Sequence, residues 1–509
     1  MTASREPARD PRSGGLTRRR LLAGGGSALG AVALATTAAP LGAALAAARR
    51  TPAVNSYGAA PAAKPLLLHS RPDLRIPGLA VGARGDGTAP GLIFIGPFGP
   101  SGTQAGAVIA DESGQQVWEH PVAGLEIYNF RVQVYRGQQV LTWWEGKLDG
   151  GHGVGTYVIA NQSYEPIAHV QPGNGLQADL HEFLLTADGT ALVTSYVTAT
   201  ADLRSVGGSS NGAIEDAIFQ EVDLASGRVL LQWHSLDHIP ISESYWPVTR
   251  NWSWDYVHVN SIDVDTDGQL LVSSRNTHTV YKVDRRSGDI IWRLGGKHSD
   301  FAMGYGASFA WQHDARRQHD GTLTIFDNEG APHAGPQSRA IVLAIDEQHR
   351  TARLRRQFLH PLALQASSLG NVQLLPNGNV FVGWGAEPFV SEFAPSGELL
   401  FDARFGSGYG GYRAFRFPWE ATGEGLPSIA AARQGAHTTN LWVSWNGDTQ
   451  VRRWLVLGAA QTGALTPLGT YPRSGFETAI QINGLPRRLA VRGLDAHGHP
   501  LGTSATLEV

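Results

Sequence analysis

Short runs of alternating hydrophobic and polar residues recur along the chain, and each follows a polar turn. Residues 322–326 (TLTIF) follow the Asp320-Gly321 turn and alternate with the period of two that is typical of a β-strand. Helical periodicity is nearly absent after residue 50, so the pattern predicts an all-β protein. The same turn and strand pattern follows four other glycines, Gly137, Gly189, Gly268 and Gly378.

A second kind of hairpin alternates with these strands and begins at Ser-Gly turns, for example Ser287-Gly288 before DIIWRLG. Gly268, Gly321 and Gly378 lie 53 and 57 residues apart, a spacing that suits a four-stranded unit with its loops. Five such units are visible, and a strand at 91–95 contributes to another. We therefore expect a β-propeller of about six blades over residues 78–410.

The pattern changes after the propeller region. Residues 411–426 are rich in Gly, Tyr, Arg and Phe and are predicted to be a linker. Residues 427–509 contain their own alternating strands, which predict a small β-sandwich resembling a fibronectin type III module. This tail has no cluster of His, Asp and Glu, so we expect it to have a structural, surface-binding or packing role.

The N-terminus predicts export. Adjacent arginines at Arg18-Arg19-Arg20 precede an Ala/Gly/Leu-rich apolar run that extends to about residue 48, the pattern of a twin-arginine signal peptide. Residues 49–77 are expected to form a linker or an extended arm. The sequence therefore predicts a secreted or cell-envelope protein that uses the twin-arginine export machinery and keeps no stable membrane span after processing.

Composition narrows the chemistry. The formal net charge is −3, so no large basic surface for nucleic acid is expected. The chain has no cysteine, which excludes disulfides, thiolate catalysis and cysteine-ligated metals.

Three histidines stand at similar distances before an Asp-Gly turn. His181 lies seven residues before Asp188, His258 nine before Asp267, and His313 seven before Asp320. Because propeller blades are quasi-equivalent, the common offset predicts that all three histidines meet at one end of the central channel, with Arg275 close by.

Three interpretations of this cluster remain open at the level of the residues. A histidine-rich metal site is one, although Arg275 would repel a divalent cation. An anion site is the second, in which His and Arg donors hold a tetrahedral oxyanion and a neutral His attacks it. The third is a channel filled by hydrogen-bonded polar residues. Four acids lie nearby in the sequence: Asp179, Glu182, Asp263 and Asp314.

Residues 258–296 (HVNSIDVD to WRLGG) and 311–330 (WQHDARRQHDGTLTIFDNEG) resemble the bacterial arylsulfotransferases, in particular the actinobacterial-type branch of these exported six-bladed propellers. LTWWEG at 141–146, DLHEFLLTADGTALVTSY at 179–196 and SWNG at 444–447 add to the resemblance. It covers nearly all of the expected mature chain.

The resemblance implies roles for particular residues. His313 falls on the family's nucleophile, His258 and Arg275 on its sulfuryl-binding residues, and His181 on another active-site histidine, with Asn260 adjacent as a substrate-binding residue. The Asp-Leu-His-Glu sequence around His181 departs from the His-His-Asp pattern of better-known members. Aromatic residues are expected to stack on aryl rings at the mouth of the site: Trp143, Trp144, Trp384 and Tyr196.

The implied activity is a nucleotide-independent aryl-sulfate sulfotransferase without a cofactor. His313 would attack an aryl sulfate ester to form a sulfo-histidine, and a phenolic acceptor would then take the sulfuryl group in a ping-pong cycle. His181 or His258 would protonate the departing phenolate. Two alternatives are a non-catalytic propeller that binds an anionic or sulfated ligand, and a hydrolase that passes the group to water.

Overall fold

Residues 67–249, 252–330, 334–460 and 463–509 are described by a computed structural model. The predicted signal peptide at 1–48 and most of the expected arm at 49–77 lie outside these residues. Within the described part of the chain, no helix combines the length and the apolar composition needed to cross a lipid bilayer. The few short helical segments are η1 (Arg204–Val206), α2 (Ser235–His238) and η2 (Ile241–Glu243).

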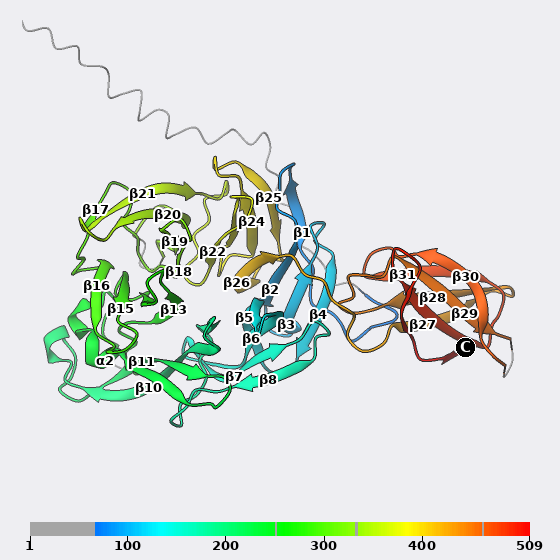
Figure 1. The fold of residues 1–509 in the computed structure, drawn as a ribbon, viewed down its shortest axis with the longest axis horizontal. Helices are drawn as coiled ribbons and strands as arrows, with labels where there is room; N and C mark the ends of the chain where they lie inside the picture. The colour runs from blue at the N-terminus through cyan, green and yellow to red at the C-terminus, as the bar shows by residue number, and fades with distance from the viewer. Residues whose placement is uncertain (1–66, 250–251, 331–333, 461–462) are drawn as a thin grey trace, which may run out of the picture. The chain divides into compact units, whose positions relative to one another are not determined.

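Six sheets of mainly antiparallel strands are arranged around a common centre, as Figure 1 shows, and the protein is therefore a six-bladed β-propeller as predicted. Blades 2 to 4 each take four consecutive strands. Blade 2 contains β5 (Glu126–Tyr135), β6 (Gln138–Asp149), β7 (His152–Ala160) and β8 (Pro166–Val170). Blade 3 contains β9 (Phe183–Leu185), β10 (Thr190–Ala201), β11 (Gly212–Asp223) and β12 (Val229–His234). Blade 4 contains β13 (Val259–Val264), β14 (Leu270–Ser274), β15 (Thr279–Val283) and β16 (Ile290–Gly295).

Blades 5 and 6 each gain one strand at the edge. Blade 5 contains β18 (His313–Arg317), β19 (Thr322–Asp327), β20 (Arg339–Asp346) and β21 (Thr351–Phe358), and β17 (Ala302–Met303) pairs with β21. Blade 6 contains β22 (Asn371–Leu374), β23 (Val380–Gly383), β24 (Phe389–Phe393) and β25 (Leu399–Arg404), and β1 (Ala80–Arg84) pairs with β25.

Blade 1 closes the ring. It combines β2 (Leu92–Phe98), β3 (Ala105–Ala110) and β4 (Gln116–Val122) with β26 (Gly410–Phe417), which pairs with β2 from the far end of the propeller sequence. Residues 410–417 were expected to be mainly linker, so the propeller extends beyond the predicted boundary at residue 410. The reason is that β26 is Gly-rich and acquires its strand structure from pairing with a segment more than 300 residues away.

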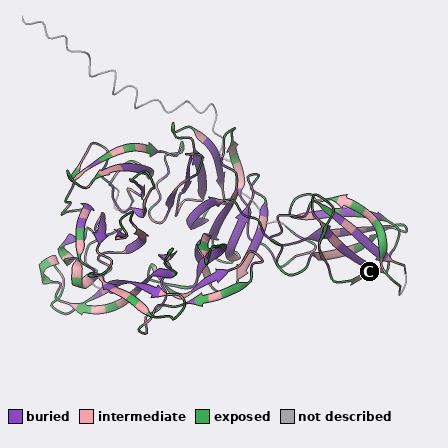
Figure 2. Ribbon diagram, in the orientation of Figure 1, coloured by how far each residue is buried: buried purple, intermediate pink, exposed green. Residues whose placement is uncertain are grey.

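One hydrophobic cluster fills each of the six interfaces between neighbouring blades. Between blades 3 and 4, for example, Phe219 and Trp233 pack against Val272 and Tyr281. Figure 2 shows that buried residues concentrate on the inner strands, whereas exposed residues follow the outer strands. Since each blade buries both faces, second strands such as β14 and β19 are buried along their whole length.

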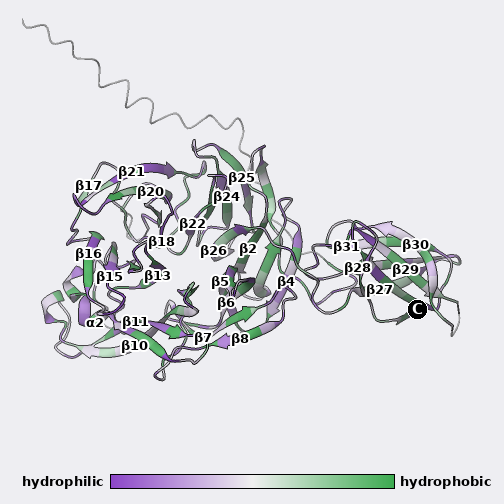
Figure 3. Ribbon diagram, in the orientation of Figure 1, coloured by the Kyte–Doolittle hydropathy of each residue, from purple (hydrophilic) through white to green (hydrophobic). Residues whose placement is uncertain are grey.

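The first strand of each blade is different, because it lines the centre. Strand β18 reads HDARR, and Figure 3 shows hydrophilic residues at this place in the ring. The strands that follow the Asp-Gly turns are therefore second strands, one position further from the centre than the strands that carry the histidines.

The tail forms two further antiparallel sheets around one core that includes Trp445, Trp454 and Leu441. One sheet contains β27 (Ser428–Gln434), β28 (Thr438–Ser444) and β31 (Glu477–Asn483). The other contains β29 (Arg453–Ala459), β30 (Thr466–Pro472), β32 (Arg488–Leu494), β33 (Pro500–Thr503) and β34 (Leu507–Glu508). The likeness to a fibronectin type III module stays a prediction.

Candidate active site

Three histidines from consecutive blades meet at one end of the ring. His181 precedes β9, His258 precedes β13, and His313 is the first residue of β18. The ring centroids of His181 and His258 are 4.7 Å apart, and those of His258 and His313 are 6.4 Å apart. The similar offsets from the Asp-Gly turns thus correspond to the start of the first strand in each blade, and the structure brings the three predicted histidines together.

Two of these histidines are held by an aspartate in the same way. Asp179 Oδ2 lies 3.0 Å from the backbone N of His181 and 2.7 Å from its Nδ1. Asp255 accepts from the backbone N–H of His258 at 3.0 Å and also contacts its Nδ1. A carboxylate accepts only, so in both pairs Nδ1 carries a proton and donates it to the aspartate. Asp179 was noted in the sequence, whereas Asp255 was not.

A fourth histidine, His152, joins the cluster and was missed by the sequence analysis. It begins β7, after the tight Gly150-Gly151 hairpin, and its ring stacks on Tyr196 at 3.8 Å. Its Nε2 lies 3.4 Å from Asp255 Oδ2, and its ring centroid lies 5.4 Å from that of His258. Two imidazoles therefore share one carboxylate.

The electrostatic surroundings give His152 and His258 different pKa values. Burial lowers the pKa of His258 to about 4, despite the opposing charge of Asp255. Burial also disfavours the charged form of His152, but the hydrogen bond and charge of Asp255 outweigh it and raise the pKa of His152 to about 9. At neutral pH, His258 is neutral and His152 carries the positive charge of the pair.

His313 is fully enclosed, with 1% of its surface exposed. Its Nδ1 lies 2.7 Å from Oδ1 of Asn328, and Leu369 donates its backbone N–H to Nε2 at 3.2 Å. Asn328 in turn donates to the backbone oxygens of Ala366 and Leu369, which fixes its amide orientation. Burial, together with the charge of Arg275, holds the pKa of His313 well below its ordinary value. His313 is therefore a neutral imidazole whose Nε2 has the lone pair.

Arg275 supplies the fixed cation of the site. Its backbone N–H donates to the carbonyl of His258 at 2.9 Å, and its guanidinium carbon lies 4.9 Å from the ring centroid of Trp311 and 5.6 Å from that of Trp246. Burial lowers the pKa of Arg275 to about 10, which leaves it charged at neutral pH. Among the described residues, its Nε has no hydrogen-bond partner, so one donor remains available for an anionic ligand.

A cavity of about 630 Å³ opens onto this group of residues. His152, His258 and Arg275 form part of its wall, while His181 and His313 lie behind them. The volume is in the range of sites that bind small organic molecules. The remaining wall includes Asp149, Gln177, Tyr196, Glu215, Trp246 and Trp252.

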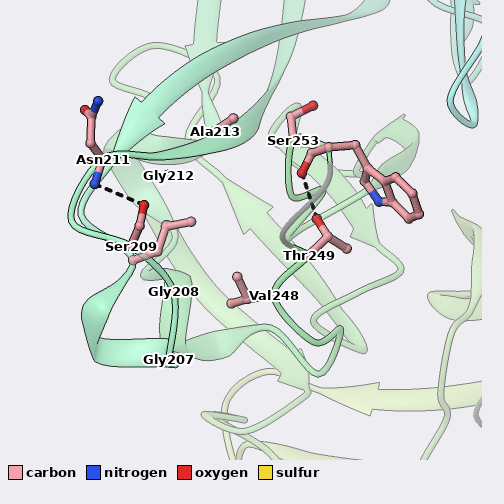
Figure 4. A pocket seen from close by; sticks show the side chains of 11 residues that line it. Gly207, Gly208, Ser209, Asn211, Gly212, Ala213, Val248, Thr249 and Ser253 are labelled. Carbon is pink, nitrogen blue, oxygen red and sulfur yellow. Dashed lines mark hydrogen bonds between the residues drawn. The ribbon is translucent and has the colours of Figure 1, made fainter.

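A second cavity of about 600 Å³ adjoins the first and shares Thr249, Trp252 and Ser253 with it. Figure 4 shows this second cavity, with the 207–212 loop on one side and Thr249 and Ser253 on the other. Trp252, which belongs to both walls, is 70% exposed. A ligand longer than one aromatic ring would therefore find a continuous surface.

The tryptophans that were expected at the mouth lie elsewhere. Trp143, Trp144 and Trp384 are at most 2% exposed and pack in the cores between blades. The indole N–H of Trp144 donates to Ala178 O. These three residues are therefore packing residues, and the prediction that they bind substrate is wrong. Trp246 and Trp252 take the expected place, together with Tyr196, which does line the cavity.

Asn260 is also enclosed rather than lining the cavity. It is completely buried on β13, and its amide donates to the backbone oxygen of Gln312 at 2.7 Å. Asn260 thus connects blade 4 to the residue directly before His313, and it acts on the position of His313 from behind.

A charged network closes the channel beneath the histidines. Glu182 is fully buried and pairs with Arg131 at 2.9 Å, with Arg413 at 3.2 Å and with Arg316. Burial alone would raise the pKa of Glu182, but the three guanidiniums outweigh it and hold the pKa below its ordinary value. The acid next to His181 in the sequence therefore fills the channel and does not face the cavity.

The cluster also contains two sets of atoms close enough to hold a cation: His152, Asp255 and His258, and His152, Asp179 and His181. In each set the carboxylate already accepts from an imidazole Nδ1, and Arg275 adds a fixed positive charge nearby. This donor set suits an anion better than a divalent metal.

One comparison with known proteins identifies a family. The family model described as Arylsulfotransferase (ASST) matches residues 131–406. A search of curated proteins found no match.

Solved structures with a similar arrangement are distant in sequence. One is a protein of unknown function from Bacteroides caccae, at 13% identity and a TM-score of 0.39, covering 64% of this chain and 98% of that one. Another is virginiamycin B lyase from Staphylococcus aureus, at 9% identity and a TM-score of 0.33, covering 73% of this chain and 97% of that one.

Proposed function

The chain belongs to the arylsulfotransferase family, and from this premise we propose that it moves a sulfuryl group from an aryl sulfate ester to a phenolic acceptor through a sulfo-histidine at His313. The observation that carries the proposal is the state of His313: a neutral imidazole, oriented by Asn328, beside the fixed cation of Arg275. A neutral imidazole is a competent nucleophile, and a cation next to it attracts the sulfate.

In the first half of the cycle, Nε2 of His313 forms a bond to sulfur while the bond between sulfur and the aryl oxygen breaks. Arg275 lies next to the three other sulfuryl oxygens, and its Nε is a donor without a partner among the described residues. Because Leu369 donates its N–H to Nε2 of His313, that contact opens when the sulfur approaches. The released N–H then becomes a further donor next to the transferred group.

In the second half, an acceptor phenol attacks sulfo-His313 and loses its proton, and the free imidazole returns. The phenol occupies the place that the first phenol vacated, which is the basis of a ping-pong cycle. Trp246, Tyr196 and Trp252 offer aromatic faces for either ring. The reaction as proposed needs neither a nucleotide nor a cofactor.

We further propose that the protein works outside the cytoplasm after twin-arginine export, as the Arg18-Arg19-Arg20 segment and the following apolar run predict. A chain without cysteine folds without disulfides, which suits export in the folded state. The tail domain remains assigned to packing or surface binding.

The test is mass spectrometry of the full chain after mixing with p-nitrophenyl sulfate, while nitrophenolate release is followed. We expect a gain of one sulfuryl group on the His313 peptide, its absence in His313→Ala, and its discharge by added phenol. His319→Ala is the matched control, because His319 is an exposed histidine in the turn between β18 and β19.

Other outcomes distinguish the alternatives. Nitrophenolate release that does not respond to added phenol would indicate a hydrolase. Binding of the ester without any release by well-folded protein would indicate a binding propeller. Loss of activity on treatment with a chelator, restored by a divalent metal, would contradict the anion-site mechanism.

A further inference from the structure

The first half of the cycle does not yet specify which group protonates the oxygen of the departing phenolate. An unsubstituted phenolate is a strong base, with a conjugate acid of pKa about 10, so its departure is faster when an acid donates a proton to the aryl oxygen. His313 cannot serve, because it is the nucleophile. His258 is neutral, with its single proton on Nδ1 committed to Asp255, so it has no proton to give.

His152 is placed differently from the other histidines. It is part of the cavity wall with 11% of its side chain exposed, and its ring lies 5.9 Å from His181 and 5.4 Å from His258. Its Nε2 faces Asp255, which leaves Nδ1 as the second donor of the charged ring. This Nδ1 is buried and has no hydrogen-bond partner among the described residues.

Local contacts hold the ring rigidly in this place. The His152 imidazole stacks on Tyr196, whose hydroxyl donates to the backbone oxygen of Val259 at 2.8 Å. The next residue, Gly153, donates its N–H to Asp179 Oδ1 at 2.9 Å, which ties the tip of the β6–β7 hairpin to blade 3. A buried donor without a partner on a rigid support is costly in the free protein, and a ligand oxygen relieves that cost.

The charges around His152 favour its protonated form. Asp255 lies before β13, Asp179 before β9, and Glu215 on β11, and all three act to keep the proton on His152. Asp149 and the oppositely charged Arg275 line the same cavity. The imidazoles of His181 and His258 are the other titratable groups that face His152.

We propose that His152 is the general acid of the donor half-reaction, an inference that rests on the proposed function. As Nε2 of His313 bonds to sulfur and the S–O bond breaks, the electron pair of that bond stays on the aryl oxygen, and His152 Nδ1 delivers its proton there. The phenol leaves neutral, and His152 becomes a neutral imidazole with Nε2–H on Asp255. In the acceptor half-reaction the same Nδ1 takes the proton of the incoming phenol, so the cycle closes without net proton exchange.

The experiment compares donors with leaving groups of different basicity in the full chain. In His152→Gln, the rate of sulfo-His313 formation from phenyl sulfate should fall by about 10² or more, the usual contribution of a general acid. From p-nitrophenyl sulfate, whose phenolate is a much weaker base, the rate should stay nearly unchanged. The basic limb of the wild-type pH profile with phenyl sulfate should also disappear in the variant.

Two further variants guard the interpretation. His152→Phe keeps an aromatic ring on Tyr196 without a proton, so it should reproduce the loss if the proton matters. His234→Gln removes another histidine of a His-Asp pair, with Asp216 at 2.7 Å, on the outer strand β12, and should leave both donors unaffected.

The outcomes separate the two proposals. If wild-type protein forms no sulfo-His313 from either donor, the proposed function and the role of His152 are both overturned. If wild-type protein forms sulfo-His313 and His152→Gln slows both donors equally, or neither, only the role of His152 as acid is overturned. Nitrogen NMR of labelled imidazoles adds a direct check, because a neutral His152 ring at pH 7.5 would contradict the assignment.

Discussion

Oδ1 of Asn328 lies 2.7 Å from Nδ1 of His313, and this contact decides which nitrogen of the ring faces the substrate. The asparagine sits at the end of the strand that follows the Asp-Gly turn, so strand β19 supports the residue that β18 presents. We predict that Asn328→Ala reduces the rate of sulfo-His313 formation by about 10-fold, the equivalent of one neutral hydrogen bond. Single-turnover kinetics with p-nitrophenyl sulfate measures it.

Asn379→Ala is a suitable control for this substitution, since Asn379 holds a turn in blade 6 through the backbone oxygen of Gly87 and the carboxylate of Glu392. It should leave the single-turnover rate unchanged. An Asn328→Ala enzyme with the wild-type rate would show that the tautomer of His313 is set by another group.

The low pKa of His258 predicts how stability responds to acid. Its folded pKa of about 4 lies below the unfolded value of about 6.5, so between these limits the unfolded chain binds a proton that the folded chain does not. The free energy of unfolding should therefore decrease as the pH falls from 6.5 to 4. Urea unfolding at a series of pH values should show a shallower decrease for His258→Gln, and an equal slope would mean that His258 is charged in the folded protein.

The network around Glu182 should be costly to break. Removing the carboxylate leaves Arg131, Arg316 and Arg413 buried with less compensating charge. We expect Glu182→Ala to lower the free energy of unfolding by about 3–5 kcal/mol, as for other broken buried ion pairs. Asp202→Ala, which breaks the exposed pair with Arg204, should leave the free energy of unfolding nearly unchanged.

Two tryptophans should separate binding from packing. Trp246 lines the cavity beside Arg275, so Trp246→Ala should raise KM for aryl sulfates by up to about 10-fold while the melting temperature changes little. Trp384 is fully buried between blades, and Trp384→Ala should instead destabilise the protein by about 3–5 kcal/mol. If Trp384→Ala raised KM and Trp246→Ala only destabilised the protein, the assignment of Trp246 as the residue that contacts the substrate ring would be contradicted.

Local signals in the sequence explain what was predicted correctly. The strands after the Asp-Gly turns are rich in β-prone residues and are preceded by a glycine with positive φ, such as Gly268 and Gly321, so neighbouring residues alone specify them. The similar offset of His181, His258 and His313 from the following Asp-Gly turn is a repeat signal of the same kind. Both features belong to single blades and need no knowledge of the closed ring.

The features that the sequence did not predict depend on contacts between distant segments of the chain. His152 does not stand at a similar distance before an Asp-Gly turn, because it lies at the tip of the β6–β7 hairpin in blade 2. It approaches Asp255 only when the propeller is closed. The sequence alone does not distinguish a buried tryptophan such as Trp384 from a cavity-lining one such as Trp246. Only the packing of blades 5 and 6 shows that Trp384 is enclosed. Strand β26 likewise has little strand character of its own before it pairs with β2.

Strand β26 also determines at which stage of folding the active site is complete. Tyr412 donates its hydroxyl to the backbone oxygens of His181 and Asn260, and Arg413 reaches Glu182, so the last strand of the ring touches the segments that carry the histidines. Its pairing with β2 spans most of the propeller sequence and is slow to form for that reason. A nascent chain that contains every catalytic residue but has not yet reached residue 417 should therefore be inactive. Activity should appear in one late step, when β26 pairs with β2 and closes the propeller.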